Sequence, residues 1–191
     1  MGRINSHSFL SMHGRVRVAT WKPYSWERPV NSVDGENIIC APGLSLLATA
    51  IIWSSIEDQN VNMGQPFKIT YAAPIYGALG TGTGTPADTD TALYAEAGRA
   101  VVTAAGTTSA SHGVPANISW LFLFPTPSVA VTITEVGVFF QAASSVGGPY
   151  GGGGTYVSGG GSLFDHSVLA NSITQTTTEM LTLSVTLTIG N

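Results

Sequence analysis

The chain has 191 residues, an ordinary length for one domain. Only 9% of its residues are charged, where about 25% is usual for a soluble domain, and no apolar run reaches the ~18 residues that a membrane-spanning helix needs. A surface with so few charges is poorly protected against association, so we expect neighbouring subunits to cover much of it.

The few charges are unevenly distributed. All seven Lys and Arg residues lie at or before Arg99, and the only charged side chains after it are Glu135, Asp165 and Glu179. A half-chain without a basic residue cannot neutralise phosphates, so we expect no nucleic-acid partner. The N-terminus lacks the apolar core of a secretory signal, and we expect a protein made in the cytoplasm and used without export.

The first quarter is predicted to hold a strand, turns and the start of a helix. Polar and apolar residues alternate at residues 15–18, which indicates a half-buried strand. Pro23, Pro29 and the pair Asp34-Gly35 mark turning segments. From Gly43 to Trp53, apolar residues at helical spacing predict a buried helix of about three turns.

The middle of the chain is predicted to alternate between extended and irregular segments. Residues 68–79 look extended, and residues 80–86 form a Gly/Thr loop. Asp88 and Asp90 offer capping oxygens, and Leu93, Glu96 and Arg99 then follow at helical spacing, so we expect a second, short helix there.

The second half is predicted to be β-structure. Residues 118–124 and 129–140 read as strands, and in the second of them the buried positions change parity near Thr134-Glu135, which indicates a β-bulge or a strand that crosses between sheets. Residues 145–162 form a Gly-rich loop. Residues 181–189 alternate strictly between apolar residues and Thr or Ser, so one face lies in a core and the other faces water or a partner.

These elements predict a mainly β fold: an antiparallel β-sandwich, jelly-roll-like, with one or two short helices. We expect residues 1–191 to form a single domain, with residues 1–36 as an N-terminal arm or strand.

No segment carries a complete catalytic or metal-binding motif. The repeat Gly80–Thr85 lacks both the Lys of a P-loop and the third glycine of a dinucleotide fingerprint. Asp88-Thr89-Asp90 lacks the Gly and distal Glu of an EF-hand. Asp165-His166-Ser167 holds the residue types of a hydrolase triad, but adjacent side chains on a strand point to opposite faces. We therefore predict no enzyme activity, no cofactor and no metal.

Two further residues, Cys40 and Glu135, are expected to be buried. The single Cys40 excludes an internal disulfide and a Cys-based zinc cluster, and its apolar neighbours favour a small buried hydrophobe over a reactive thiol. Glu135 interrupts an apolar run. Because a buried carboxylate is costly unless it is paired, we expect a structural ion pair with Arg99 or Arg15.

Five segments of the chain form a pattern when they are taken together: Tyr76–Pro86, Asp90–Leu93 with Glu96 and Arg99, Glu135–Phe139, Gly161–Phe164 and Leu181–Asn191. In order and spacing these segments resemble the structural proteins of tailed-bacteriophage particles. The match covers Tyr76 to Asn191 and is looser before Tyr76. The Gly-rich insertion is unusually long, and Asp165-His166 stands where that family often has a small residue and Arg.

The resemblance implies a structural subunit of a virion, assembled in the host cytoplasm. Its place is either the tail (fibre, collar or tip) or the head, as a decoration protein. Its partners are other virion proteins and further copies of itself, in a trimer or other cyclic homo-oligomer. Glu96 and Arg99 then support each other across one helical turn, and Glu135 or Arg99 holds the loop after Leu79 against the sandwich.

Two alternatives stay open. The chain is a receptor- or carbohydrate-binding module of the phage tail, which reads a host surface glycan through the exposed aromatic residues Trp21, Trp26, Tyr150 and Tyr156. Otherwise it is a small hydrolase at a virion tip.

Overall fold

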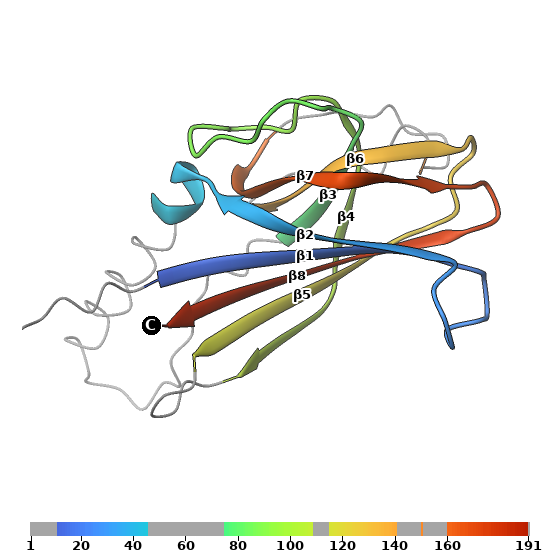
Figure 1. Cartoon of the computed structure of the whole chain (residues 1–191), viewed down its shortest axis with the longest axis horizontal. Helices are drawn as coiled ribbons and strands as arrows, with labels where there is room; N and C mark the ends of the chain where they lie inside the picture. The colour runs from blue at the N-terminus through green and yellow to red at the C-terminus, as the bar shows by residue number, and fades with distance from the viewer. Residues whose placement is uncertain (1–10, 46–74, 109–114, 141–149, 151–159, 191) are drawn as a thin grey trace, which may run out of the picture.

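The computed structural model describes residues 11–45, 75–108, 115–140, 150 and 160–190, which form a closed barrel of eight antiparallel strands (Figure 1). The order around the barrel is β1-β2-β7-β6-β3-β4-β5-β8, and β8 pairs back to β1. The strands are β1 (Ser11–Trp21), β2 (Asn31–Ile39), β3 (Ile75–Gly80), β4 (Glu96–Thr108), β5 (Ala116–Phe124), β6 (Val131–Phe140), β7 (Ser162–Gln175) and β8 (Met180–Gly190).

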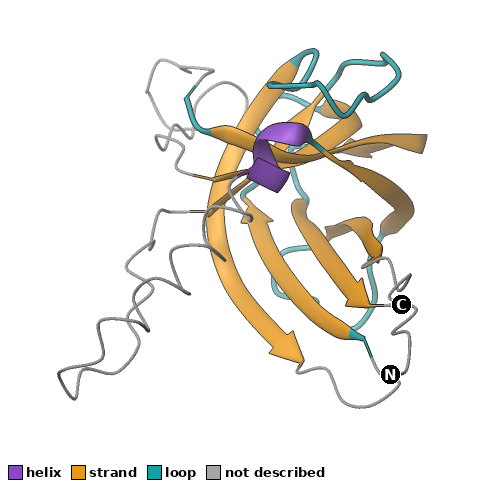
Figure 2. Cartoon of the chain, turned by 90° about the vertical axis from the view of Figure 1, so that its left-hand side faces the viewer, coloured by secondary structure: helices purple, strands orange, loops and turns teal. Residues whose placement is uncertain are grey.

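The predicted β-sandwich is wrong, because two strands belong to both halves of the structure. β2 pairs with β1 over residues 31–37 and then with β7 through Ile38 and Ile39. β4 pairs with β3 over residues 96–101 and with β5 from Val102 onward. Since β2 and β4 each pass from one sheet to the other, the two sheets share these strands. The sheets therefore join into one closed barrel. Figure 2 shows the strands curving around the core.

The barrel interior is filled by apolar side chains at alternate strand positions. The strict alternation predicted for residues 181–189 is confirmed: β8 buries every second residue, from Leu181 to Leu187. Each such side chain contributes about 1.5–3 kcal/mol through burial. Other large, fully buried members of this core are Phe122, Phe124, Ile133, Val138 and Phe164.

A second, smaller core lies outside the barrel wall. Residues 81–95 fold back over the outer face of β3, β6 and β7, so a side chain such as Phe139 is buried on the side opposite to Val138. Cys40 belongs to this outer core and is 0% exposed, which confirms its predicted burial. The members are Cys40, Tyr76, Ala78, Leu93, Phe139 and Leu163.

The predicted irregularity in the strand at 129–140 is confirmed. In β6 the register with β7 shifts between Ile133, which faces Ile173, and Glu135, which faces Val168. Thr134 of β6 and residues 169–172 of β7 are thereby left out of the ladder, an irregularity of the β-bulge type. The shift turns Glu135 to the outer face, under the loop that covers it.

The short helix predicted after Asp88–Asp90 is wrong. Residues 88–95 form a loop, and Glu96 begins β4. A helix needs its backbone N–H groups for bonds along its own axis, but the N–H groups of Tyr94 and Ala95 donate to the Glu135 carboxylate. A tertiary contact therefore overrides the local pattern.

Two further predictions for the first half have other outcomes. The turn expected at Asp34-Gly35 is wrong, since both residues lie within β2 and pair with Arg17 and Val16 of β1. A short helix spans residues 41–45, and the rest of the helix predicted from Gly43 to Trp53 lies outside the described residues, like most of the 145–162 loop. Within residues 1–36, the described part from Ser11 onward holds β1, a loop and the first residues of β2.

Candidate functional site

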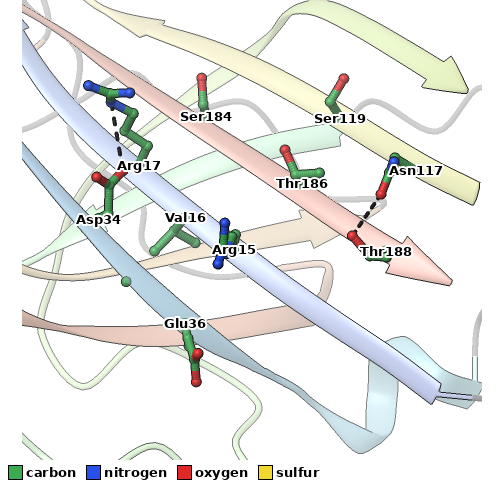
Figure 3. Close-up of a pocket in the computed structure, with 11 residues that line it drawn as sticks. Arg15, Val16, Arg17, Asp34, Glu36, Asn117, Ser119, Ser184, Thr186 and Thr188 are labelled. Carbon is green, nitrogen blue, oxygen red and sulfur yellow. Dashed lines mark hydrogen bonds and ion pairs between the residues drawn. The ribbon is translucent and has the colours of Figure 1, made fainter. Parts of the chain in front are cut away.

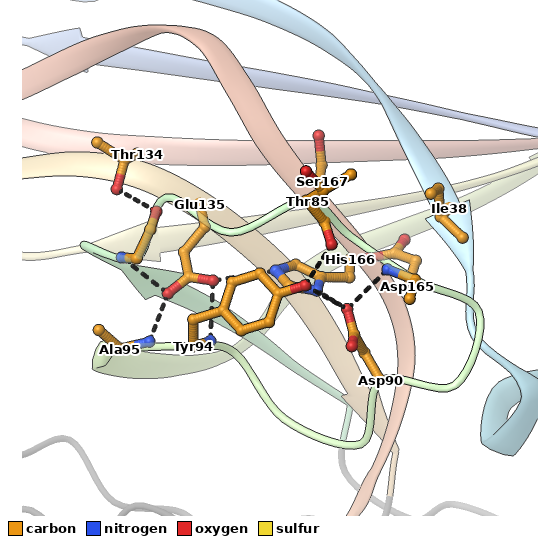
Figure 4. Close-up of polar contacts among 12 residues, drawn as sticks. Ile38, Thr85, Asp90, Tyr94, Ala95, Thr134, Glu135, Asp165, His166 and Ser167 are labelled. Atoms are coloured by element: carbon orange, nitrogen blue, oxygen red, sulfur yellow. Dashed lines mark hydrogen bonds and ion pairs between the residues drawn. The ribbon is translucent and has the colours of Figure 1, made fainter.

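A buried carboxylate organises the outer face of β6 (Figure 4). Glu135 is 0% exposed and accepts four hydrogen bonds. Three come from the backbone N–H groups of Gly82, Tyr94 and Ala95, at 2.9, 3.0 and 2.7 Å. The fourth comes from Nε2 of His166 at 3.0 Å. A carboxylate has about four acceptor sites, so Glu135 is fully satisfied and fastens the 81–95 loop to the barrel.

His166 of β7 lies between two carboxylates. Its Nδ1 is 2.7 Å from Oδ2 of Asp90, its Nε2 bonds Glu135, and its ring is fully buried. Both ring nitrogens donate only in the imidazolium form, so the geometry favours a charged histidine. The Tyr94 ring lies over the imidazole with ring centroids 4.9 Å apart. We call Asp90, Tyr94, Glu135 and His166 the clasp.

Hydrogen bonds in the clasp outweigh the effect of burial on each pKa. Burial would raise the pKa of Glu135, but the bonds from His166 and three backbone N–H groups lower it below its ordinary value. Burial likewise acts to raise the pKa of Asp90, and bonds from the Ala87 N–H, His166 and Tyr94 lower it. Burial would lower the pKa of His166, but Glu135 and Asp90 raise it. Each shift favours the charged form.

The Gly-Thr repeat is shaped by the clasp. A Cβ atom at Gly82 would lie 2.5 Å from Oε1 of Glu135, and one at Gly84 would lie 2.5 Å from the Tyr94 ring. A Cβ at Gly80 would also collide with the Glu135 side chain. The repeat therefore provides a backbone that can approach Glu135 closely, which side chains would prevent. The loop predicted for residues 80–86 is confirmed from Thr81 onward, while Gly80 is the last residue of β3.

Glu135 is paired as predicted, but the predicted partners are wrong. Arg15 lies exposed on the outside of β1, and Arg99 bonds elsewhere, so the cation beside Glu135 is His166. No spacing in the sequence singles out His166 as this partner, because it lies 31 residues from Glu135 on another strand. Of the two residues expected to hold the loop after Leu79, Glu135 and Arg99, it is Glu135 that accepts the bond from the Gly82 N–H.

Glu96 and Arg99 do pair, although on a strand. In β4, Glu96 faces Gly80 and Gly98 faces Leu79, so Ala97 is an extra residue in the ladder. This bulge brings two side chains three residues apart to one side. Arg99 is 2% exposed, donates from Nη2 to Glu96 at 2.9 Å and from Nη1 to the Gly160 carbonyl at 2.8 Å, and its guanidinium lies 3.6 Å from the Phe139 ring centroid.

The residues of Asp165-His166-Ser167 bond in different directions, as strand geometry predicts. Asp165 accepts from Nδ2 of Asn37 at 2.6 Å and from the Val138 N–H at 3.0 Å. Ser167 donates to the Glu36 carbonyl at 2.7 Å. Burial raises the pKa of Asp165 to about 7, although the bonds from Asn37 and Val138 and the nearby His166 oppose this shift.

The geometry of the clasp fits a structural role, in which its side chains hold the 81–95 loop against the barrel. Both nitrogens of His166 are occupied by carboxylates, and Glu135 is surrounded by donors. Burial and the carboxylates of Asp165, Asp90 and Asp88 raise the pKa of the nearby Cys40 thiol to about 12, so it stays protonated at neutral pH. Within the described residues, no group of three or more His, Cys, Asp or Glu side chains could hold a metal ion.

The four aromatic residues predicted to be exposed have different fates. Trp26 is 51% exposed, and its ring centroid lies 5.5 Å from that of Trp21. Trp21 is half-buried and donates from Nε1 to Oγ1 of Thr182 at 2.9 Å. Tyr150 is 4% exposed, so its predicted exposure is wrong, because its ring packs against Phe124 in the barrel core. Tyr156 lies outside the described residues.

The outer face of β2, β1, β8 and β5 carries a polar trough of about 950 Å³ (Figure 3). The sequence pointed to part of it, the Thr/Ser face of residues 181–189, but not to its walls, which come from three other strands. Its lining side chains are Arg15, Arg17, Asp34, Glu36, Asn117, Ser119, Ser184, Thr186 and Thr188.

Comparisons of the chain with protein-family models, with curated proteins and with solved structures found no match to any of them. No helix in the described ranges has the length and apolarity to span a membrane.

Proposed function

We propose that the chain is a structural subunit of a tailed-phage particle that acts through contacts between subunits. Its place is the tail, as a fibre, collar or tip component, or the head, as a decoration protein. It works as a homo-oligomer, in a trimer or another cyclic assembly, without a catalytic site or cofactor. The resemblance of residues 76–191 to virion proteins motivates the class, and the surface supplies the physical argument.

One observation carries the proposal: the second half of the chain exposes almost no charge. After Arg99 the sequence has three charged side chains, Glu135, Asp165 and Glu179. Glu135 and Asp165 are both 0% exposed. A single charged side chain, Glu179, is thus left for the outside of nearly half the chain. Surface charge keeps free proteins from associating. Because residues 100–191 expose almost no charge, their surface is suited to contacts with other subunits.

The second half of β4 offers a specific contact. Residues 103–108, Thr-Ala-Ala-Gly-Thr-Thr, are all exposed and uncharged. In the described part of the chain, residues 102–108 pair with β5 along one edge only. An exposed edge without charges or proline is a ready template for pairing with another strand. We therefore place a contact between subunits at this edge.

The resembling segments also act as one physical unit. Glu135, from one segment, binds Gly82 of the Gly-Thr segment. Its other ligands include Tyr94 and Ala95, which lie between the Asp90–Leu93 block and Glu96. Segments that lie far apart in sequence but contact each other in the fold are expected to keep a pattern in common with proteins of the same fold. This convergence supports the resemblance on which the virion assignment depends.

The first experiment measures the mass of the purified chain by sedimentation over a range of concentrations. We expect an oligomer, and we expect Ala105→Lys to shift it toward the monomer, because a charge at a strand edge opposes pairing. Ser32→Lys places the same charge on an exposed position of β2 and should leave the mass unchanged. A chain that stays monomeric at high concentration contradicts the proposal.

The second experiment locates the subunit in intact particles by electron microscopy after labelling with an antibody against this chain. Density at the tail or on the head supports the virion role and separates its two forms. Particles that lack the chain contradict that role.

A second candidate is a receptor- or carbohydrate-binding role. The Trp21–Trp26 pair beside the polar trough favours it, because exposed aromatic faces next to convergent polar groups are typical of small-ligand sites. Binding of the purified chain to immobilised oligosaccharides, or its absence, tests this candidate independently of the structural role.

A further inference from the structure

The polar trough is built from side chains in transverse rows across four neighbouring strands (Figure 3). Strands lie about 4.8 Å apart, so a row of four side chains spans about 14 Å. The register places the rows directly: the first runs Glu36, Arg15, Thr186 and Ser119 from β2 to β5, and the second runs Asp34, Arg17 and Ser184 from β2 to β8.

The centre of the trough holds polar side chains that have no side-chain partner in the described part of the chain. Arg15, Ser184 and Thr186 make no side-chain hydrogen bond or ion pair with any residue that the structure describes. Arg17 is 3.7 Å from Asp34, with both side chains largely exposed, and such a pair is weak and easily exchanged for other partners. These donors and acceptors are therefore free to bind a ligand.

The charges of the trough cancel. Arg15 and Arg17 face Glu36 and Asp34 across β1 and β2, so the lining has two positive and two negative groups among amide and hydroxyl groups. An anionic polymer would meet two carboxylates beside the two guanidinium groups. A neutral ligand whose hydroxyl groups both donate and accept can use every group of the lining. Neutral sugars have this chemistry.

The same face ends in an aromatic platform. Thr182, the outward neighbour of Ser184 on β8, accepts the hydrogen bond from Trp21, so the Trp21 indole lies on the trough side of the sheet. Trp26 packs on Trp21 and remains 51% exposed. A flat, half-exposed indole offers an apolar face against which the C–H face of a sugar ring can pack.

The β1–β2 loop holds a third aromatic residue in a strained backbone conformation. Tyr24 has φ 65° and follows Pro23 in the turn closed by the bond from Ser25 N–H to the Lys22 carbonyl. Proline followed by a positive φ is the pattern of a type II turn, which favours Gly at the Tyr24 position. Tyr24 is 99% exposed, so no buried contact offsets the strain. Strain of this kind clusters at binding sites.

We propose that the trough binds a neutral oligosaccharide, with one sugar ring packed on Trp26 and further hydroxyl groups bonded by Arg15, Ser184 and Thr186. Tyr24, two residues before Trp26 in the β1–β2 loop, offers a further exposed ring. This site rests on the carbohydrate-binding role given above as the second candidate function, and it is independent of the structural role.

The test uses the whole purified chain. It is applied to immobilised maltohexaose, cellohexaose, mannohexaose and chitohexaose as neutral probes, with hyaluronan and polysialic acid as anionic probes, and affinities are then measured by calorimetry. We expect binding to at least one neutral probe and a loss of tenfold or more in Arg15→Ala. Arg28→Ala removes the same charge from the β1–β2 loop outside the trough and should keep the affinity.

A second variant guards against loss of folding. Tyr24→Gly removes an exposed ring and relieves the turn, so we expect weaker binding by threefold or more in a protein whose melting temperature does not fall. Neutral binding that both variants leave unchanged overturns the site while the carbohydrate-binding role stands. Binding to the anionic probes alone overturns the neutral class. No binding to any probe overturns the site together with that role.

Discussion

Nε2 of His166 donates to Oε2 of Glu135 at 3.0 Å, and neither side chain is exposed to solvent. This pair links β7 to β6 on the outer face of the barrel, and through Gly82, Tyr94 and Ala95 it holds the loop that closes the outer core. A buried ion pair is costly to desolvate unless its remaining hydrogen-bonding sites are filled. Here Glu135 has three further donors and His166 has Asp90, so the pair meets that condition.

Removing the charge of Glu135 should destabilise the fold. In Glu135→Gln the new amide N–H groups face the N–H groups of His166 and Tyr94, so donors oppose donors and His166 loses a charged partner. We expect a loss of about 3 kcal/mol in the free energy of unfolding, measured by urea titration. Glu179→Gln makes the same change at a more exposed site and should stay within about 0.5 kcal/mol of the unaltered protein.

The contribution of the clasp should depend on pH with a defined window. The raised pKa of His166 means that its stabilisation is complete below its ordinary value of 6.5 and is lost as pH rises through the folded-state pKa. The pKa values of Glu135 and Asp90 are lowered, so the stabilisation that these carboxylates contribute is complete above pH 4.5 and pH 3.8, their ordinary pKa values. It is lost as pH falls through their folded-state pKa values. The full contribution therefore lies between about pH 4.5 and 6.5.

The window is measured as the difference in unfolding free energy between the unaltered protein and His166→Gln, by urea titration at half-unit steps from pH 3 to 9. The difference should be largest and flat inside the window and should decline on both sides. A difference that is constant over the whole range would contradict a charged His166.

Local alternation was enough to predict parts of the fold. The strand at 181–189 and the bulge near Thr134 follow from side-chain parity alone. Closure of the barrel does not, because it depends on where β2 and β4 change partners, and the alternation of a strand is the same in a sandwich and in a barrel. The helix expected after Asp90 failed for a related reason: Glu135, some forty residues away, takes the N–H groups that a helix would use.

The site was predictable to the same degree. The apolar neighbours of Glu135 indicated burial and a partner, but the partner could not be chosen, since Arg99, Arg15 and His166 are all far from it in sequence. The trough was least accessible to sequence reasoning. Arg15, Glu36 and Ser119 come from three strands, and only the register of the closed barrel puts them in one row.

Asp165 should be a source of instability at neutral and alkaline pH. Its pKa is about 7 in the folded protein and has an ordinary value of 3.8, so the folded state holds an extra proton between these values and stability falls as pH rises through this range. Asp165→Asn removes this loss. When the Asn37 amide turns over, the new amide donates to Oδ1 of Asn37, a buried acceptor that has no hydrogen-bond partner in the described structure, in place of the bond that Asp165 accepts from Nδ2 of Asn37.

We expect Asp165→Asn to raise the unfolding free energy by about 2 kcal/mol at pH 8 and to have little effect at pH 4. Urea titrations at the two pH values check this. Asp34→Asn alters an exposed carboxylate whose ion pair is weak, and its effect should stay below about 0.5 kcal/mol at both pH values. Equal effects of Asp165→Asn at pH 4 and pH 8 would exclude titration of Asp165 as the cause.

In the turn at Lys22–Ser25, two substitutions of Tyr24 can distinguish the effect of backbone strain from the effect of the side chain. Tyr24 has φ 65°, a conformation that costs a residue with a Cβ atom about 1–2 kcal/mol relative to Gly. Tyr24→Gly should therefore raise the unfolding free energy by about 1 kcal/mol, since Gly also gains freedom in the unfolded chain. Tyr24→Ala keeps the Cβ atom and should bring no such gain. If both variants are equally stable, the strain is not in the backbone, and the argument that Tyr24 is kept for a ligand loses its support.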